Sequence, residues 1–92
     1  MAKVVVTLKI MPDSPETDLD AIESKAKQAI EDFAGKTETK TEQEPIAFGL
    51  KAVKIMFVMA EEKGSTEELE KAISSIESVN GCEITDVRRA IG

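Results

Sequence analysis

Apolar and polar residues alternate along residues 3–10, where one side of the extended chain carries Val4, Val6, Leu8 and Ile10. This period of two predicts a strand with one buried face. In the next segment apolar residues recur at steps of three and four, which predicts a helix over residues 18–33. Either Thr17 or Asp18 can cap the start of this helix, and Gly35 is placed to end it.

The second half of the chain repeats strands and a helix. Residues 36–43 have threonine at every second position and no large apolar residue, which predicts an exposed edge strand. Residues 50–59 are apolar on nearly both sides and predict a central strand. Ser65 and Glu68 have the spacing of a capping box, so a second helix is expected to begin there and to run to about Ser78.

Asn80 and Gly81 are expected to turn the chain into a last strand over residues 82–87. Val87 breaks the alternation of this strand, which predicts a bulge or a strand end near Asp86. The order strand, helix, strand, strand, helix, strand predicts an α+β, ferredoxin-like βαββαβ sandwich. We therefore expect a four-stranded antiparallel sheet with two helices on one face, formed by a single domain over residues 1–92.

The composition argues against several classes of function. A net charge of -6 with scattered basic residues argues against direct binding of nucleic acid. The chain has no histidine, and no glycine-rich loop has the spacing that cradles a nucleotide, so neither a catalytic site nor a cofactor is expected. No run approaches the roughly 18 apolar residues that a membrane span needs, and the first residues do not form a signal sequence. A cytoplasmic protein is the expectation.

Two isolated features have ordinary structural explanations, and one RNA-binding class of the same topology does not fit the sequence. The acidic residues near the first helix, Asp13, Glu16, Asp18 and Asp20, lack the glycine and the distal glutamate of a calcium loop, and we interpret them as helix-start residues. The single cysteine, Cys82, has no neighbour that would lower its pKa and is expected to be a core residue. An RNA-recognition motif would need aromatic residues on the central strands, and the first strand has none.

The connection before the central strand, residues 44–50 (EPIAFGL), is unusual because apolar residues lie between a proline and a glycine. Phe48 either folds back onto the core or is exposed so that a partner covers it, and the residues alone do not decide between these alternatives. Arg88 and Arg89 are either a solvated strand end or, together with Phe48, part of a protein interface. Aromatic residues and arginine are the usual anchors of such interfaces.

Three stretches occur together in this chain: residues 10–15 (IMPDSP) leading to Asp18 and Leu19, residues 44–50, and residues 85–89 (TDVRR). In order and spacing they resemble the archaeal elongation factor 1-beta family over essentially the whole chain. The resemblance implies a ferredoxin-like fold and an activity that is not bond-making chemistry. A member of this family promotes exchange of GDP for GTP on elongation factor 1-alpha, which regenerates the GTP form that binds aminoacyl-tRNA.

The resemblance also implies which residues bind the partner. A phenylalanine at the position of Phe48 contacts the GTPase in eukaryotic relatives, so partner binding is assigned to Phe48 with Pro45, Ile46 and Gly49. Eukaryotic relatives carry a lysine that aligns near Gly92, where this chain has no basic residue. Arg88 and Arg89 are the basic residues nearest to that position, and they are included in the expected site.

The alternative function is a ferredoxin-like regulatory module that binds a small molecule such as an amino acid. Such modules usually pair and hold the ligand between the two copies. For the exchange factor, in contrast, we expect a free-standing monomer that binds elongation factor 1-alpha and uses no cofactor. A dimer stabilised by an amino acid would favour the alternative.

Overall fold

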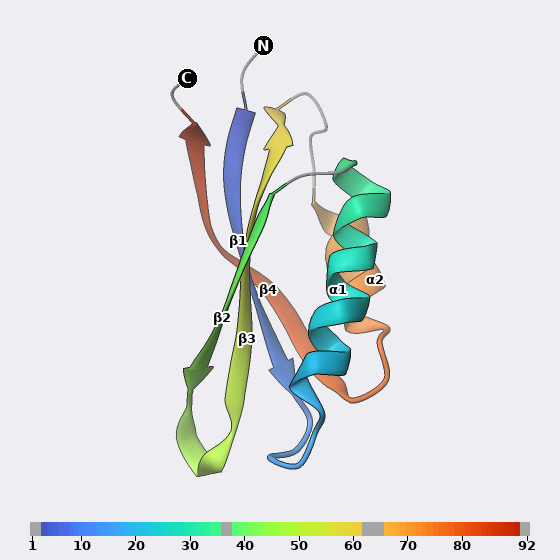
Figure 1. The fold of residues 1–92 in the computed structure, drawn as a ribbon, viewed down its shortest axis with the longest axis vertical. Coiled ribbons are helices and arrows are strands. Elements are labelled where there is room, and N and C mark those ends of the chain that lie inside the picture. The colour runs from blue at the N-terminus through green and yellow to red at the C-terminus, as the bar shows by residue number, and fades with distance from the viewer. Residues whose placement is uncertain (1–2, 36–37, 62–65, 91–92) are drawn as a thin grey trace.

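The computed structural model describes residues 3–35, 38–61 and 66–90. In chain order the elements are β1 (Lys3–Pro12), α1 (Leu19–Ala34), β2 (Thr39–Pro45), the short 3-10 segment η1 (Ala47–Gly49), β3 (Lys51–Ala60), α2 (Glu67–Ser74) and β4 (Val79–Ala90). The four strands form one antiparallel sheet in the order β2-β3-β1-β4. Both helices pack on the same face of this sheet and leave the other face uncovered (Figure 1). The predicted ferredoxin-like α+β fold is confirmed.

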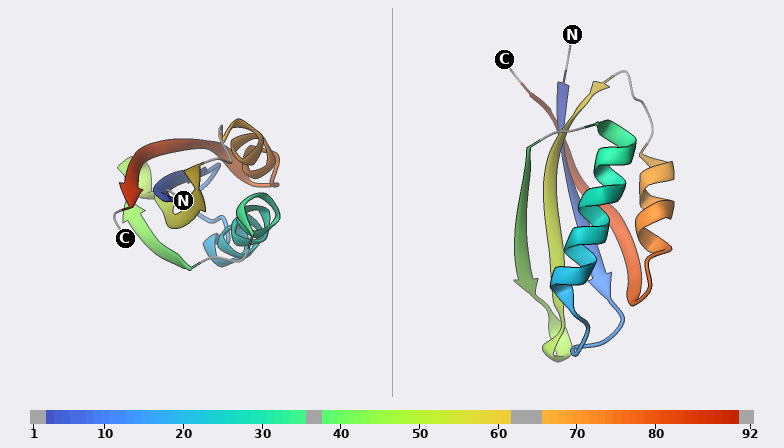
Figure 2. Two further views of the ribbon diagram at one scale, coloured as in Figure 1. Left: turned by 90° about the horizontal axis from the view of Figure 1, so that it is seen from above. Right: turned by 45° about the vertical axis from the view of Figure 1, so that its right-hand side comes forward.

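The hydrophobic core lies between the two helices and the central strands β1 and β3. In the register, Val6 lies opposite Phe57 and Leu8 lies opposite Ile55, and all four side chains are buried. The helices contribute the apolar faces that their periodicity predicted, namely Ile22, Ala26 and Ile30 from α1 and Leu69 and Ile73 from α2. Because successive strand residues point to opposite faces, the residues of β1 and β3 that alternate with the buried ones face the uncovered side of the sheet. Figure 2 shows both helices on one side of the sheet.

The first helix begins and ends as its sequence predicts. Asp18 Oδ1 accepts hydrogen bonds from the backbone N–H groups of Asp20 and Ala21, at 3.1 and 3.3 Å. Gly35 follows the last turn with a φ of 83° and a ψ of 180°, a positive-φ conformation that glycine adopts without steric strain. The expected capping box of the second helix includes Ser65, which lies outside the described residues, and Thr66 occupies the N-cap position.

The second helix is shorter than expected and ends at Ser74. The Ser75 hydroxyl donates a 2.8 Å hydrogen bond to the Lys71 carbonyl. Such side-chain bonds compete with the backbone bonds of a helix, which is why serine is a weak helix former. The chain then turns through Ser78, which has a φ of 74°. The turn expected at Asn80 and Gly81 was therefore wrong, because β4 has already begun at Val79.

The last strand is longer than predicted and contains the expected bulge. Along the pairing of β4 with β1, Ile84 lies opposite Leu8 and Asp86 lies opposite Thr7, so Thr85 is the extra residue. The first strand also continues further than expected, to Pro12, which lies opposite Val79 after a second irregularity at Asn80. Proline is tolerated there because the regular ladder ends at this point.

Replacing Phe57 by alanine should lower the free energy of unfolding by about 3–5 kcal/mol, because the buried ring leaves a cavity that the core fills only in part. The neighbouring residue Met56 faces the uncovered side of the sheet and is 38% exposed. Met56→Ala is therefore the matched control, with an expected loss of less than about 1 kcal/mol. Urea denaturation of both variants checks this assignment of faces, and equal losses would contradict it.

Candidate functional site

The β2–β3 hairpin ends in a tip that projects beyond the other strands at one end of the sheet (Figure 1). Pro45 opposite Lys51 is the last pair of the ladder, so residues 46–50 form the tip. The Ile46 N–H donates to the Leu50 carbonyl at 2.8 Å, and the Leu50 N–H donates to the Ala47 carbonyl at 3.3 Å. These two bonds fix the shape of the connection that the sequence singled out.

Both central residues of the tight turn have left-handed backbone conformations. Phe48 has φ 63° and ψ 28°, and Gly49 has φ 76°. Together with the bond from the Leu50 N–H to the Ala47 carbonyl, these angles describe a type I′ turn, the connection whose twist matches a β-hairpin. Such a turn favours asparagine, aspartate or glycine at the position of Phe48. A bulky L-residue in this left-handed conformation lowers the stability of the fold by roughly 1–2 kcal/mol.

The side chain of Phe48 is 92% exposed. Of the two alternatives that the sequence left open, the structure therefore shows the outward one. Leaving a phenylalanine in water forgoes roughly 1.5–3 kcal/mol of burial. Because the backbone of Phe48 is strained as well, this residue lowers the stability of the isolated chain twice, and no contact among the described residues compensates for either loss.

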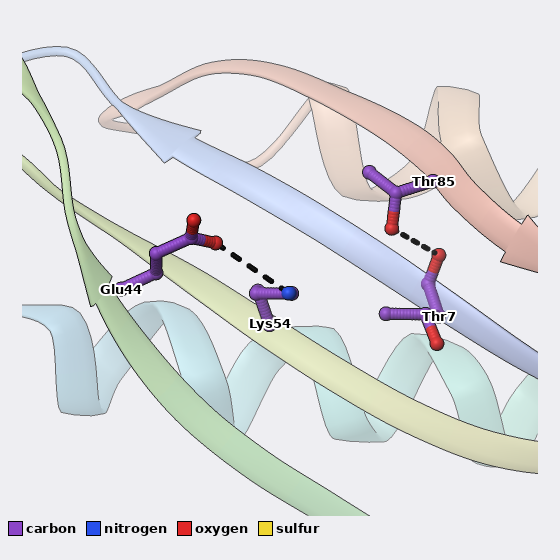
Figure 3. A network of polar contacts seen from close by, with 4 residues as sticks. All are labelled: Thr7, Glu44, Lys54 and Thr85. Carbon is purple, nitrogen blue, oxygen red and sulfur yellow. Dashed lines mark hydrogen bonds and ion pairs between the residues drawn. The ribbon is translucent and has the colours of Figure 1, made fainter.

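The tip itself is uncharged, and charges begin at its base. Residues 45–50 carry no ionisable side chain, whereas Glu44 and Lys51 flank them. Glu44 Oε2 lies 3.5 Å from Lys54 Nζ, and this ion pair connects β2 with β3 on the uncovered face of the sheet (Figure 3). Both side chains are partly exposed, so the pair contributes about 0–1 kcal/mol and mainly orients the two strands behind the tip.

Arg88 and Arg89 lie at the opposite end of the sheet and not beside Phe48. Arg88 is opposite Val5, which is opposite Val58 on β3. The seven steps from Lys51 to Val58 span about 23 Å at the usual rise of a strand. Arg88 Nε pairs with Asp86 at 2.8 Å, and an Arg89 amino group pairs with Glu61 at 2.7 Å. The structure therefore separates the two parts of the expected site.

The remaining chemical candidates are structural. Burial, and then the nearby carboxylates of Glu70 and Glu83, raise the pKa of the Cys82 thiol from 9.0 to about 12, which keeps it protonated at neutral pH. Asp13 accepts a 3.1 Å hydrogen bond from the Thr17 hydroxyl. Within the part of the chain that the structure describes, no group of three or more His, Cys, Asp and Glu side chains is arranged to hold a metal ion.

No helix among residues 3–35, 38–61 and 66–90 combines the length and apolar character needed to cross a membrane.

Sequence reasoning missed the type of the turn at the hairpin tip. The available signal was the glycine at position 49, because glycine at the second central position is typical of a type I′ hairpin, although the usual first residue is asparagine, aspartate or glycine rather than phenylalanine.

Comparison with known proteins relates this arrangement to one family. Residues 5–90 match the family described as the EF-1 guanine nucleotide exchange domain. The chain is 44% identical to elongation factor 1-beta of Methanothermobacter thermautotrophicus over 89 residues, 97% of this chain and 98% of that protein. It is 36% identical to elongation factor 1-beta of Halobacterium salinarum, again over 97% of this chain and 99% of that one. Among solved structures, the de novo designed protein Foldit4 superposes with a TM-score of 0.62 at 17% identity over 98% of both chains.

Replacing Phe48 by asparagine should leave the protein at least as stable as the wild type and raise the free energy of unfolding by up to about 1 kcal/mol. Asparagine adopts the left-handed conformation of this turn with less strain, and its exposure to water costs little. Urea denaturation measures the effect, with Phe57→Ala as the control for a buried ring. A loss above about 1 kcal/mol would show that the Phe48 ring stabilises the fold.

Cys82 should react slowly with iodoacetamide near neutral pH in the folded protein, because its raised pKa leaves almost no thiolate. Unfolding in urea should restore the rate of an ordinary cysteine. The unfolded thiol ionises above about 9 and the folded one only near 12, so this group makes the fold less stable as pH rises through that window. Mass spectrometry follows the alkylation, and equal rates in both states would contradict the assignment.

Proposed function

Because the chain belongs to the family of EF-1 guanine nucleotide exchange domains, we propose that it promotes the exchange of GDP for GTP on elongation factor 1-alpha and docks on this GTPase through Phe48. The observation that carries the docking proposal is the 92% exposure of Phe48 on a left-handed backbone. The relatives named above are themselves called elongation factor 1-beta, which supports a translation GTPase as the partner. The proposal places the protein in the cytoplasm as a monomer.

Docking would offset the exposure of Phe48 and make use of its strained backbone. Burial of the ring in an apolar pocket of the partner recovers the free energy that its exposure forgoes. The strained turn holds the ring outward before the partner binds, so little conformational entropy is lost on binding. Pro45 fixes one end of the tip because its ring restricts φ, and Gly49 supplies the second left-handed residue. Ile46 is half-buried, and its backbone N–H bonds to the Leu50 carbonyl across the tip.

Arg88 and Arg89 are proposed as a second contact at the far end of the sheet. Both guanidinium groups are largely exposed and each is paired with one carboxylate, which leaves further N–H donors for a partner. Because this contact lies about 23 Å along β3 from the base of the hairpin tip, the GTPase would have to present two separate surfaces. A phosphate or carboxylate on the partner is the natural acceptor for an arginine fork.

Exchange of this kind requires no catalytic residue in the exchange factor. If the factor binds the nucleotide-free GTPase more tightly than the GDP-bound form, thermodynamic linkage requires that GDP binds the complex less tightly by the same factor. The phosphates of GDP are held by a metal ion and positive groups of the GTPase, so displacement of those groups accelerates release. The chain's part in this mechanism is to bind and to hold two surfaces of the partner in one arrangement.

The wild-type protein should accelerate the release of fluorescent GDP from elongation factor 1-alpha, and Phe48→Asn should reduce this stimulation about tenfold or more, the effect of losing an interface anchor. Asparagine is chosen because it fits the turn, so a loss of activity cannot be attributed to unfolding. Ser24→Ala, an exposed change on α1, is the control and should be silent. No acceleration by the wild type would refute the function. Full stimulation by Phe48→Asn would refute the docking role of the ring.

A further inference from the structure

The uncovered face of the sheet is hollowed into a groove of about 400 Å³ to which all four strands contribute. Thr7 and Met56 lie on the central strands in its floor. Lys40 and Lys54 line it on the side of β2 and β3, and Asp86 and Arg88 line it on the side of β4. A second hollow of about 190 Å³ shares Lys40 and Met56 and extends the depression along β3. We call this surface the sheet groove.

The bulge in β4 accounts for one wall of the sheet groove. An extra residue in one strand bends that strand and increases its twist. β4 curves around one side of the central strands (Figure 2). The Thr85 hydroxyl donates a long, 3.4 Å hydrogen bond to the Thr7 carbonyl, across the bulge (Figure 3).

The larger hollow of the sheet groove, with Glu44 at its margin, carries three basic and three acidic side chains in a strongly acidic protein. Glu38 adds one carboxylate in the second hollow. Three basic side chains are each paired with one carboxylate, namely Lys40 with Glu42 at 3.7 Å, Lys54 with Glu44 at 3.5 Å and Arg88 with Asp86 at 2.8 Å. The whole chain has a net charge of -6, so most of the excess of acidic residues lies on other surfaces. Exposed pairs of this kind contribute about 0–1 kcal/mol each and can be re-formed with other partners at little cost.

The position of the sheet groove connects the two proposed contacts. Arg88 lines the groove directly, and the ion pair between Glu44 and Lys54 leads from the groove to the base of the hairpin tip. In Figure 1 the tip bends away from the helices, toward the side that the sheet leaves uncovered. A partner that holds Phe48 and Arg88 at once must therefore pass over this face.

We propose that the sheet groove is the central part of the docking surface and receives an extended polar segment of the GTPase between its contacts with Phe48 and Arg88. This inference rests on the proposed function. A balanced surface gives no electrostatic attraction to a nucleic acid backbone. In a two-fold pair, a second copy would present the same concave surface, which cannot fill a hollow. Paired charges around Met56, which is 38% exposed, instead suit a segment that presents both polar groups and one apolar side chain.

Protection of a thiol placed in the sheet groove tests the proposal. Met56→Cys supplies the thiol, while the native Cys82 remains protonated and reacts slowly. Ser24→Cys on the opposite, helical side of the molecule is the control. Nucleotide-free elongation factor 1-alpha should slow alkylation at position 56 about tenfold or more and change that at position 24 less than about twofold, as burial in an interface requires.

Charge reversal of matched lysines gives an independent measurement. Lys54 in the groove and Lys27 on α1 are 34% and 40% exposed, and each pairs with one glutamate. Lys54→Glu should weaken binding to the nucleotide-free GTPase about tenfold, whereas Lys27→Glu, with the same change in net charge, should weaken it less than about twofold. Thermal melts of both variants establish that they are folded.

The outcomes separate this inference from the proposed function. A wild-type protein that does not stimulate GDP release defeats the proposed function itself. If stimulation occurs and depends on Phe48, but position 56 stays reactive in the complex and Lys54→Glu binds like Lys27→Glu, only the sheet groove is excluded. Protection of position 56 by a second copy of this chain, or by transfer RNA alone, would also overturn the proposal because it would identify a different occupant.

Discussion

The antiparallel pairing of β1 with β3 is the constraint on which the rest of the structure depends. It places Leu8 opposite Ile55 and Ile10 opposite Val53, and so assembles the apolar layer that both helices cover. It also fixes the direction of β3, whose first residue, Lys51, lies two positions beyond the last pair with β1. The tip that precedes Lys51 must therefore extend past the core. The same ladder directs the start of β1 and the end of β4 away from the tip. The molecule is therefore 42 Å long, and Phe48 and the two arginines lie at opposite ends.

The sequence was sufficient for the fold where one strong periodicity matched one buried surface. The alternation in β1 and the stripe in α1 predicted their buried faces because burial of apolar side chains selects the register directly. Prediction failed where a local preference competed with long-range pairing. Asn80 and Gly81 are typical turn residues, yet pairing of β4 with β1 takes them into the strand, and Asn80 remains visible only as an irregularity in the ladder. The turn forms earlier instead, where Ser75 ends the helix.

The candidate site could be located from the sequence but not oriented. The apolar residues between Pro45 and Gly49 identified the connection, because large apolar side chains in a loop are usually either buried in the core or exposed for a partner. Whether Phe48 points inward depends on the handedness of its backbone, which no pattern of apolar residues encodes. The sheet groove was beyond sequence reasoning for a different reason. It depends on the bulge that forms where β4 pairs with the distant strand β1, and on the charges of four strands brought to one face.

The absence of charge from residues 45–50 has a thermodynamic consequence for recognition. A contact made by an uncharged apolar tip is driven by the release of water from its surface, which gives binding a negative heat-capacity change and little dependence on ionic strength. Contacts made by exposed ion pairs weaken instead as salt screens them. The strength of binding at the two ends of this molecule would therefore depend on different variables. Binding at the tip would vary with temperature, and binding at the arginine end would vary with ionic strength.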